Sequence, residues 1–520
     1  MEEKYILSLD IGTTTIRSFI YNSRGESVGK SSDQTILHYP QHGFVEIDPD
    51  ELWDSIVHIV EKALQDAGLS AGQMTALGIS TQRSTFITWS RLTGKPFHRF
   101  ITWNDLRADK LVKNWNDSFT WKTTLRFSWA LQNITALRNA VEANDAMFGT
   151  LDTWLLYKLT GRKVHITDVS SASATGFFDP FVMQWATWAM SFFSIPISSL
   201  PTVVDTAGDH FTSTDPSIWG VSIPIRSSMA DQTASMWGSC CFEPGDTKLT
   251  MGTGTFFNIN TGTSPEASIS GFYPVVGWRV KDDLVYVMEG SNNDTGSIIT
   301  WAQSVGLFDK PADSADIAMS VKDSDGVYFI PAFSGLGPPY NDTTAASGFL
   351  GVKASTTKAH LVRAVLESIA FRTAQICECA RAETKYQFHH IRLDGGVSNN
   401  DFVAQLVADL TGLRVERPHQ VEMSSLGCAY ITGLQLGLWK TKKELQSLRK
   451  VGRAFTPRPA VRNTYTRVMA RWEEAVKRFS DWYVNESSGS GAAVADSAAP
   501  PVRKESTRVN LTKKTSNTCK

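Results

Sequence analysis

Short apolar runs alternate with longer amphipathic stretches along most of the chain. Residues 5–11 predict a buried strand, and residues 16–21 predict a second strand that returns from it after a small polar turn at 12–15. Asp48 and Pro49 suit the N-cap and the first position of a helix. Its apolar positions share one face and precede Gly68: Leu52, Trp53, Ile56, Val57, Val60 and Leu64. Another strand is predicted at 76–80. This alternation of strands and helices predicts an α/β layered domain.

The same pattern begins again near residue 247, with a strand, a Gly/Thr turn and a returning strand. A further strand is predicted from Tyr328 and another at 390–393, and helices are predicted at 359–380, 401–410 and 425–436. The echo is either a coincidence or the mark of a second lobe built on the plan of the first. The predicted organisation is a first lobe at 1–246 and a second lobe at 247–484. The polar, Ser- and Ala-rich residues 485–520 predict a disordered tail.

Composition narrows the possible functions. A chain of 520 residues is expected to form two or more domains. The 51 Lys and Arg residues balance 52 Asp and Glu residues, so no field for nucleic acid or an anionic membrane is expected. The N-terminal residues do not have a signal-peptide layout, and no apolar run is long enough to span a bilayer. The six cysteines lack zinc-type spacing, which predicts reduced thiols in a cytoplasmic protein.

Two turns far apart in the sequence could bind phosphate. The turn from Asp10 to Thr15 combines a strand-end carboxylate, a glycine and three threonines. Backbone N–H groups and Thr hydroxyls can bond phosphate oxygens, and the carboxylate can hold Mg²⁺ directly or through water. The turn from Gly252 to Thr255 offers the same donors without the acid. Either turn alone could simply close a hairpin. The chain has no P-loop and no protein-kinase catalytic loop, so phosphoryl transfer would need another scaffold.

Two further features have both a structural and a functional interpretation. The turn from Asp394 to Asn400 lies between a predicted strand and helix, so it could accept a flat group or an anion, or be an ordinary turn with an Asn cap. Asp231 follows a predicted strand at 223–229 and precedes Gln232. It could accept a proton from an attacking hydroxyl, or it could cap a helix.

The order of these features resembles the FGGY carbohydrate kinases, and within them the glycerol kinase branch. The resemblance extends from Tyr5 to about Trp482. The matching segments are Leu9-Asp-Ile-Gly-Thr-Thr, Gly78-Ile-Ser-Thr-Gln-Arg, Gly149-Thr-Leu-Asp-Thr-Trp, Thr167-Asp-Val-Ser-Ser-Ala-Ser, Ala230-Asp-Gln, Met251-Gly-Thr-Gly-Thr, Ile330-Pro-Ala-Phe-Ser-Gly-Leu-Gly-Pro-Pro-Tyr, Arg363-Ala-Val-Leu-Glu-Ser-Ile-Ala-Phe, Asp394-Gly-Gly and Gly427-Cys-Ala-Tyr. The segments from Gly78 and Leu249 are most similar to a divergent animal branch.

The resemblance implies two lobes of the actin-like ATPase (ribonuclease H-like) fold, with ATP and substrate in a cleft between them. It implies that Asp231 is the catalytic base and that Asp10 serves Mg²⁺ and the phosphates. The nucleotide-binding positions that it implies are Thr13, Thr14, Arg17, Gly252, Thr253, Gly296, Gly396, Asn400 and Thr300, the last where many relatives carry a Gln. On this reading the echo between the two hairpins is a duplicated plan.

The substrate pocket is where the chain departs from the family pattern. The positions that match are Arg83, Trp103, Asp231, Gln232 and Phe256. The Glu that follows the Arg in the family is Ser84 here, and the segment around Trp121 to Phe127 offers no equivalent of the family's Tyr. Loss of a charged hydrogen bond to a substrate hydroxyl weakens binding by roughly 10- to 150-fold. Ser84 could recover part of this through water.

The resemblance therefore implies ATP-dependent phosphorylation of glycerol to glycerol 3-phosphate with release of ADP. The altered pocket keeps two alternatives open: a kinase of another polyol or sugar, and a catalytically weak, nucleotide-binding regulatory protein. The expected partners are a small polyol and ATP, with no nucleic acid and no integral membrane segment. A homo-oligomer is left open.

Overall fold

The N-terminal hairpin is the start of a five-stranded sheet. The computed structural model describes residues 3–108, 122–420 and 422–483, so the predicted tail at 485–520 and Trp121 lie outside the described residues. In this first sheet β1 pairs antiparallel with β2, which pairs antiparallel with β3, while β5 and then β13 continue parallel to β1. The strands in spatial order are β13 (Ile225–Ala230), β5 (Met74–Thr81), β1 (Tyr5–Ile11), β2 (Thr15–Tyr21) and β3 (Ser27–Gln34).

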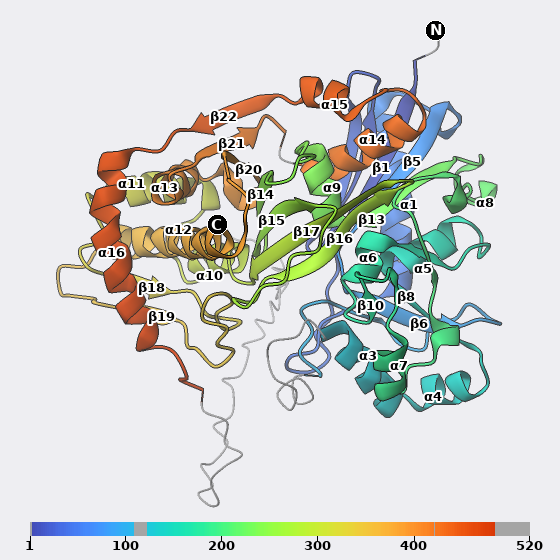
Figure 1. Ribbon diagram of the computed structural model, residues 1–520, viewed down its shortest axis with the longest axis horizontal. Helices are drawn as coiled ribbons and strands as arrows, with labels where there is room; N and C mark the ends of the chain where they lie inside the picture. The colour runs from blue at the N-terminus through green and yellow to red at the C-terminus, as the bar shows by residue number, and fades with distance from the viewer. Residues whose placement is uncertain (1–2, 109–121, 421, 484–520) are drawn as a thin grey trace, which may run out of the picture. The chain divides into compact units, whose positions relative to one another are not determined.

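A second sheet of seven strands occupies the other half of the chain (Figure 1). Its strands in spatial order are β16 (Tyr273–Val280), β17 (Asp283–Asn292), β15 (Thr255–Gly262), β14 (Thr247–Met251), β20 (His390–Asp394), β21 (Arg414–Pro418) and β22 (Val451–Phe455). From β17 to β21 the pairings are antiparallel, antiparallel, parallel and parallel. The first sheet has the same succession from β3 to β13. The echo in the sequence is therefore a duplicated sheet plan.

Smaller sheets are inserted around these two. A four-stranded sheet orders β4 (Glu46–Ile47), β7 (Phe100–Ile101), β6 (Phe86–Ser90) and β8 (Ala146–Thr150). Three two-stranded sheets pair β10 (Phe178–Asp179) with β11 (Gln184–Trp185), β12 (Thr202–Val204) with β9 (Ile166–Asp168), and β18 (Tyr328–Ile330) with β19 (Gly348–Leu350).

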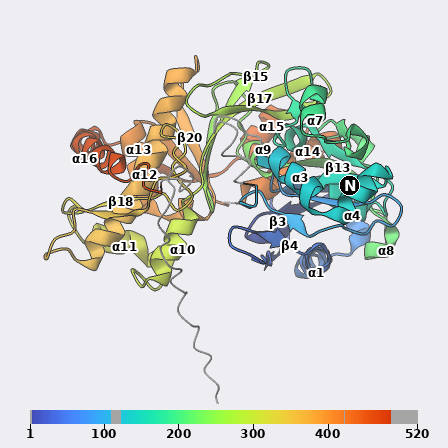
Figure 2. The same ribbon diagram turned by 90° about the horizontal axis from the view of Figure 1, so that it is seen from below.

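Helices cover the sheets, and their ends follow the sequence signals. The helices are α1 (Pro49–Ala67), α3 (Lys122–Asn133), α4 (Thr135–Glu142), α5 (Leu151–Leu159), α6 (Val169–Ser173), α7 (Thr187–Phe192), α8 (Pro216–Trp219), α9 (Asp231–Gly238), α10 (Gly296–Ser304), α11 (Ser314–Met319), α12 (Lys358–Glu383), α13 (Asp401–Thr411), α14 (Met423–Gln435), α15 (Lys442–Leu448) and α16 (Pro459–Lys477). The side chain of Asp48 caps α1, which ends at a left-handed Gly68 and packs on β2 and β3 (Figure 2). The three long helices predicted in the second half are α12, α13 and α14.

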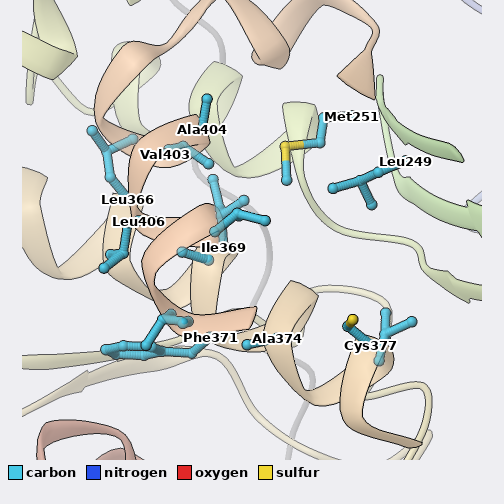
Figure 3. Close-up of a cluster of buried hydrophobic side chains, with 14 of the residues drawn as sticks. Leu249, Met251, Leu366, Ile369, Phe371, Ala374, Cys377, Val403, Ala404 and Leu406 are labelled. Carbon is cyan, nitrogen blue, oxygen red and sulfur yellow. The ribbon is translucent and has the colours of Figure 1, made fainter. Parts of the chain in front are cut away.

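Each lobe has its own core. In the second lobe α12 is buried along most of its length and packs with α13 and the strands, through residues such as Leu249, Leu366, Ile369 and Val403 (Figure 3). Burial of apolar surface of this kind is the main force that holds such a lobe together. Within the described residues, no helix is long and apolar enough to cross a membrane.

The two lobes are joined where α9 and α14 pack against each other. These helices occupy equivalent places, since α9 follows β13 and α14 follows β21. A Cβ added at Gly427 would collide with the carbonyl oxygen of Ala234, and one added at Gly238 would collide with that of Met423. Helix α14 also packs on β1 and β5, so a helix from the second half of the sequence covers the first sheet.

We predict that Gly427→Ala lowers the free energy of unfolding by about 1–3 kcal/mol, because the helix backbones would have to separate to admit a methyl group. Gly72→Ala is the matched control, since the nearest atoms to its added Cβ lie 3.9 Å away. Thermal or urea unfolding measures both variants. Equal stability of Gly427→Ala and the wild type would contradict the predicted backbone contact.

Candidate active site

The predicted site residues of the first lobe stand at one edge of its sheet. Asp10 lies near the end of β1, Arg83 follows β5, and Asp231 follows β13. These three strands are parallel to one another, so their carboxyl ends meet at the same edge. Open α/β sheets bind ligands at this edge, because the loops and helix N-termini there present free polar groups.

Asp10 is a buried carboxylate with two partners. Its Oδ1 accepts a hydrogen bond from Ser80 Oγ at 2.9 Å, and its Oδ2 lies 3.6 Å from Arg17 Nη1. Burial raises the pKa of Asp10, while the Arg17 guanidinium and the Ser80 hydroxyl offset part of that rise. In the described ranges, no three His, Cys, Asp or Glu side chains cluster in a way that could hold a metal ion.

The two Gly/Thr turns meet. The hydroxyl oxygens of Thr14 and Thr253 lie 3.2 Å apart although the residues are 239 positions apart in sequence. The side chain of Thr13 donates to Gln82 Oε1 at 3.2 Å and accepts from Trp103 Nε1 at 2.8 Å, which ties the first turn to the predicted pocket. Gly296 donates its N–H to the carbonyl oxygens of both Gly252 and Thr253. A Cβ at Gly296 would lie 2.6 Å from Gly252 O, so only glycine allows this approach.

Asp231 is the first residue of α9, and hydrogen bonds fix the backbone immediately before it. The backbone N–H of Ala230 donates to Ser170 Oγ at 2.9 Å, and that hydroxyl donates to Asp168 at 2.7 Å. Burial raises the pKa of Asp231 to about 6, although Arg83 and Lys248 act in the opposite direction. A carboxylate with a pKa near 6 is ionised at neutral pH and basic enough to accept a proton.

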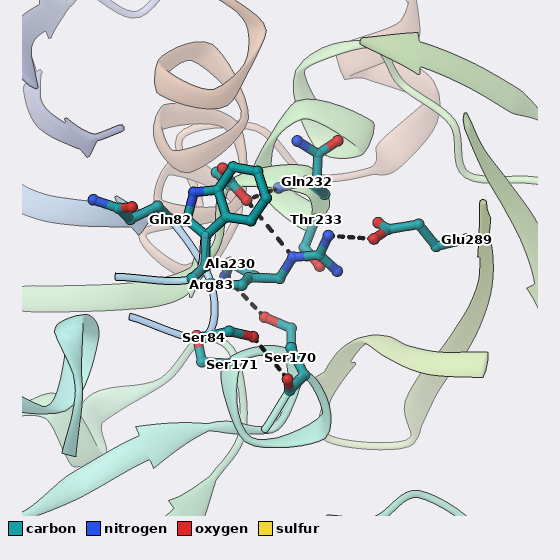
Figure 4. A network of polar contacts seen from close by, with 12 residues as sticks. Gln82, Arg83, Ser84, Ser170, Ser171, Ala230, Gln232, Thr233 and Glu289 are labelled. Atoms are coloured by element: carbon teal, nitrogen blue, oxygen red, sulfur yellow. Dashed lines mark hydrogen bonds and ion pairs between the residues drawn. The ribbon is translucent and has the colours of Figure 1, made fainter. Parts of the chain in front are cut away.

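Arg83 lies between two carboxylates (Figure 4). Its Nε is 3.8 Å from Asp231 Oδ1, and its Nη2 donates to Glu289. Burial alone would lower the pKa of Arg83, but the charges of Glu289, Tyr273 and Asp231 raise it above the ordinary value. Aromatic rings border this group: Arg83 lies 6.0 Å from the centroid of the Phe256 ring, and Trp103 meets Phe256 edge to face at 6.3 Å. Gln232 is buried, and its Oε1 accepts from Lys248 Nζ at 2.6 Å.

Ser84 does not take the place of the family's carboxylate. Its backbone has a left-handed φ of 63°, and its hydroxyl donates to the carbonyl oxygen of Ala174 at 2.8 Å. The hydroxyl is therefore used to connect the loop after β5 with the end of α6. Phe127, at the far end of the segment that lacks the family's Tyr, is buried and packs against Phe86 and Phe148.

The residues predicted on the adenine side have fewer contacts with the other predicted site residues. Gly396 is exposed, and a Cβ there would meet nothing within 4 Å. Asn400 is the N-cap of α13, where its Oδ1 accepts from Val403 N, and its Nδ2 donates to Ser314 Oγ. The cap interpretation is thus observed, while its nucleotide role stays a prediction. Thr300 is exposed on α10.

Two buried charges beside the site were missed from the sequence. Lys248 in β14 and Glu289 in β17 are both 0% exposed. Each is a charged residue at a buried strand position, which is unusual because an unpaired buried charge is costly. That pattern is a signal that both residues have partners, but it does not identify the partners.

Known proteins share the sequence and the fold of this chain. Models of the FGGY family of carbohydrate kinases match the chain twice, the N-terminal domain over residues 5–238 and the C-terminal domain over residues 247–436. Glycerol kinase 5 of Danio rerio is 49% identical over 516 residues, covering 92% of this chain and 97% of that protein. Glycerol kinase 5 of Homo sapiens is 45% identical over 509 residues, covering 92% and 96%. The crystal structure of Plasmodium falciparum glycerol kinase with ADP is similar with a TM-score of 0.82 at 28% identity, covering 92% of this chain and 98% of that one.

The duplicated sheets, together with these similarities, define a two-lobed α/β carbohydrate kinase. The chain belongs to the FGGY family of carbohydrate kinases. The resemblance found in its motifs is confirmed, including the similarity to an animal branch of the glycerol kinases.

Proposed function

We propose that this protein transfers the terminal phosphoryl group of ATP to a hydroxyl of glycerol, forming glycerol 3-phosphate and ADP. The observation that carries the proposal is the meeting of the two turns at Thr14 and Thr253, beside the pocket of Arg83, Trp103 and Asp231. Phosphoryl transfer depends mainly on positioning and on stabilising charge, and donors from two lobes at one point supply both. The names of the relatives support glycerol as the acceptor.

Each pocket residue has a role in this proposal. Asp231 accepts the proton of the attacking hydroxyl, since its pKa of about 6 leaves it ionised at neutral pH. Arg83 and Gln232 bind substrate hydroxyls, and Lys248 fixes the orientation of the Gln232 amide by occupying its oxygen. Trp103 and Phe256 provide apolar surface for the carbon chain.

The described residues also fit a nucleotide and its metal ion. The residues that present hydroxyl and backbone donors are Thr13, Thr14, Gly252, Thr253 and Gly296. The exposed Gly396 leaves room for a flat base, and Asn400 and Thr300 are the other residues proposed on the adenine side. Mg²⁺ with ATP neutralises charge on the phosphates when bound. Asp10 would hold that ion directly or through water, and the guanidinium of Arg17 would interact with the same phosphates.

A kinase of another polyol or sugar is the second candidate, because the Ser84 hydroxyl is bound to Ala174 and is not directed to Arg83. Steady-state release of ADP with glycerol, dihydroxyacetone, erythritol and pentuloses separates the two candidates. We expect the highest kcat/KM with glycerol. Efficient use of a pentulose, with glycerol turned over only at millimolar concentration, would overturn the glycerol assignment.

We predict that Asp231→Asn lowers kcat by roughly 10²- to 10⁴-fold, because the amide cannot accept the proton. Stabilisation of the variant by ATP in thermal unfolding should persist, since binding to the native state does not require a base. Asp209→Asn is the control, as that side chain is 92% exposed and pairs only with Arg226 among the described ion pairs. Equal ATP consumption by Asp231→Asn and the wild type would instead favour a regulatory protein.

We predict that kcat/KM for glycerol falls about tenfold per pH unit below about pH 6, where Asp231 of the free enzyme becomes protonated. The sign follows from the carboxyl group, whose basic form is the ionised one found at higher pH. A pH profile of kcat/KM, from initial rates at glycerol concentrations well below KM, measures the midpoint. Asp231→Glu should move that midpoint. If the midpoint came from titration of ATP instead, the substitution would leave it unchanged. A rate that stays constant down to about pH 5 would contradict the role of Asp231.

A further inference from the structure

The ion pair between Arg83 and Glu289 connects the two lobes inside the substrate pocket. Arg83 follows β5 of the first sheet, whereas Glu289 lies in β17 of the second sheet. The Glu289 side chain is 0% exposed and that of Arg83 is 11% exposed. A pair so well shielded from water is screened little by salt, and either partner left alone would be a costly buried charge.

Glu289 is itself held by its neighbours on both sides. Asn258 in β15 and Tyr273 in β16 are its cross-strand partners in the sheet. The Asn258 amide donates to Glu289 Oε2 at 2.6 Å, and the Tyr273 hydroxyl donates to Oε1, the oxygen that also accepts from Arg83. Three adjacent strands therefore fix the carboxylate, because side chains at paired positions lie on the same face of a sheet.

The carboxylate beside Arg83 comes from the second lobe and not from the loop after β5. The family pattern has a Glu after the Arg and a Tyr in the pocket, but Ser84 stands at the first position and its hydroxyl is bound to Ala174. The Glu289 carboxylate reaches Arg83 from the second lobe, and the Tyr273 phenol donates to that carboxylate.

The charges around Arg83 bear on the kind of substrate. Asp231 and Glu289 place two negative charges next to the single positive charge of Arg83. Arg83 therefore has no unmatched charge with which to attract a carboxylate or phosphate on the substrate.

We propose that Glu289 and Tyr273 are positioning residues that hold Arg83 for a neutral polyol and disfavour an acidic one. The inference rests on the proposed function and names the basis of its specificity. Glu289 acts through Arg83, by fixing one arm of the guanidinium so that the remaining N–H groups meet substrate hydroxyls.

The test compares Glu289→Gln with the wild type. The KM for glycerol should rise roughly 10-fold or more, because the guanidinium is no longer held by a charged hydrogen bond. The change in kcat should stay within about threefold, since the proton acceptor is intact. D-glycerate, used as a competitive inhibitor, should bind about tenfold more tightly, because one negative charge beside Arg83 is gone. Tyr273→Phe should raise the KM for glycerol by a smaller factor.

A second triad in the chain provides matched controls. Arg363 Nε donates to Glu367 Oε1 at 2.8 Å, and the Tyr465 hydroxyl donates to the same oxygen at 2.7 Å. Glu367→Gln and Tyr465→Phe remove the same groups within the second lobe, at α12 and α16. They should leave the KM for glycerol and the inhibition by D-glycerate within about twofold of wild type, at temperatures where all variants are folded.

An Arg83→Ala background shows whether Glu289 acts through Arg83. Adding Glu289→Gln to Arg83→Ala should raise KM no further, because the group being positioned is already absent. Additive effects of the two substitutions on KM would overturn the inference, as would an unchanged KM and unchanged D-glycerate inhibition in Glu289→Gln. In either case, turnover of glycerol by the wild type would still support the proposed function. If the wild type turns over no polyol, the proposed function fails and the inference falls with it.

Discussion

The structure depends on the close crossing of α9 and α14. Gly238 and Gly427 let the two helix backbones touch, and no larger residue fits at either position without moving a helix. Asp231 is the first residue of α9, so this crossing sets its place relative to the second lobe. Two polar contacts reinforce it: Ser424 of α14 donates to the carbonyl oxygen of Asp231, and Ser235 of α9 donates to Asp394 at the end of β20. The helix that carries the proposed base is thus attached to both sheets.

Around this crossing the protein combines an apolar junction with buried charges. Residues of both sheets, α9 and α14 form a continuous apolar cluster. Beside it Lys248, Glu289 and Arg83 are almost completely buried. A buried ion pair contributes little net stability compared with well-packed apolar side chains, although breaking one is costly. The retention of these charges is therefore better explained by the site than by stability.

The sequence allowed good prediction wherever the signal was local. Asp48, Pro49 and Gly68 define α1 because capping depends on adjacent residues, and the two hairpins follow from apolar runs on either side of small polar turns. The contact between Thr14 and Thr253 could not be derived from either turn, since it depends on how two sheets pack. Glu289 was missed for the same reason: its partners are set by strand register and by a loop of the other lobe. Asn400 shows the opposite case, where local rules alone account for the cap that is observed.

The carboxylate that holds Arg83 comes from the second sheet, at Glu289, whereas the residue next to Arg83 in its own loop is Ser84. With Glu289 as the partner, the guanidinium is oriented only while β17 of the second sheet lies against the loop after β5. The turns at Thr14 and Thr253 meet under the same condition. In the proposed function, substrate orientation and phosphate binding would therefore be complete in the same arrangement of the lobes. In that arrangement Asp231 faces Arg83, and the acceptor hydroxyl would be deprotonated next to the phosphate.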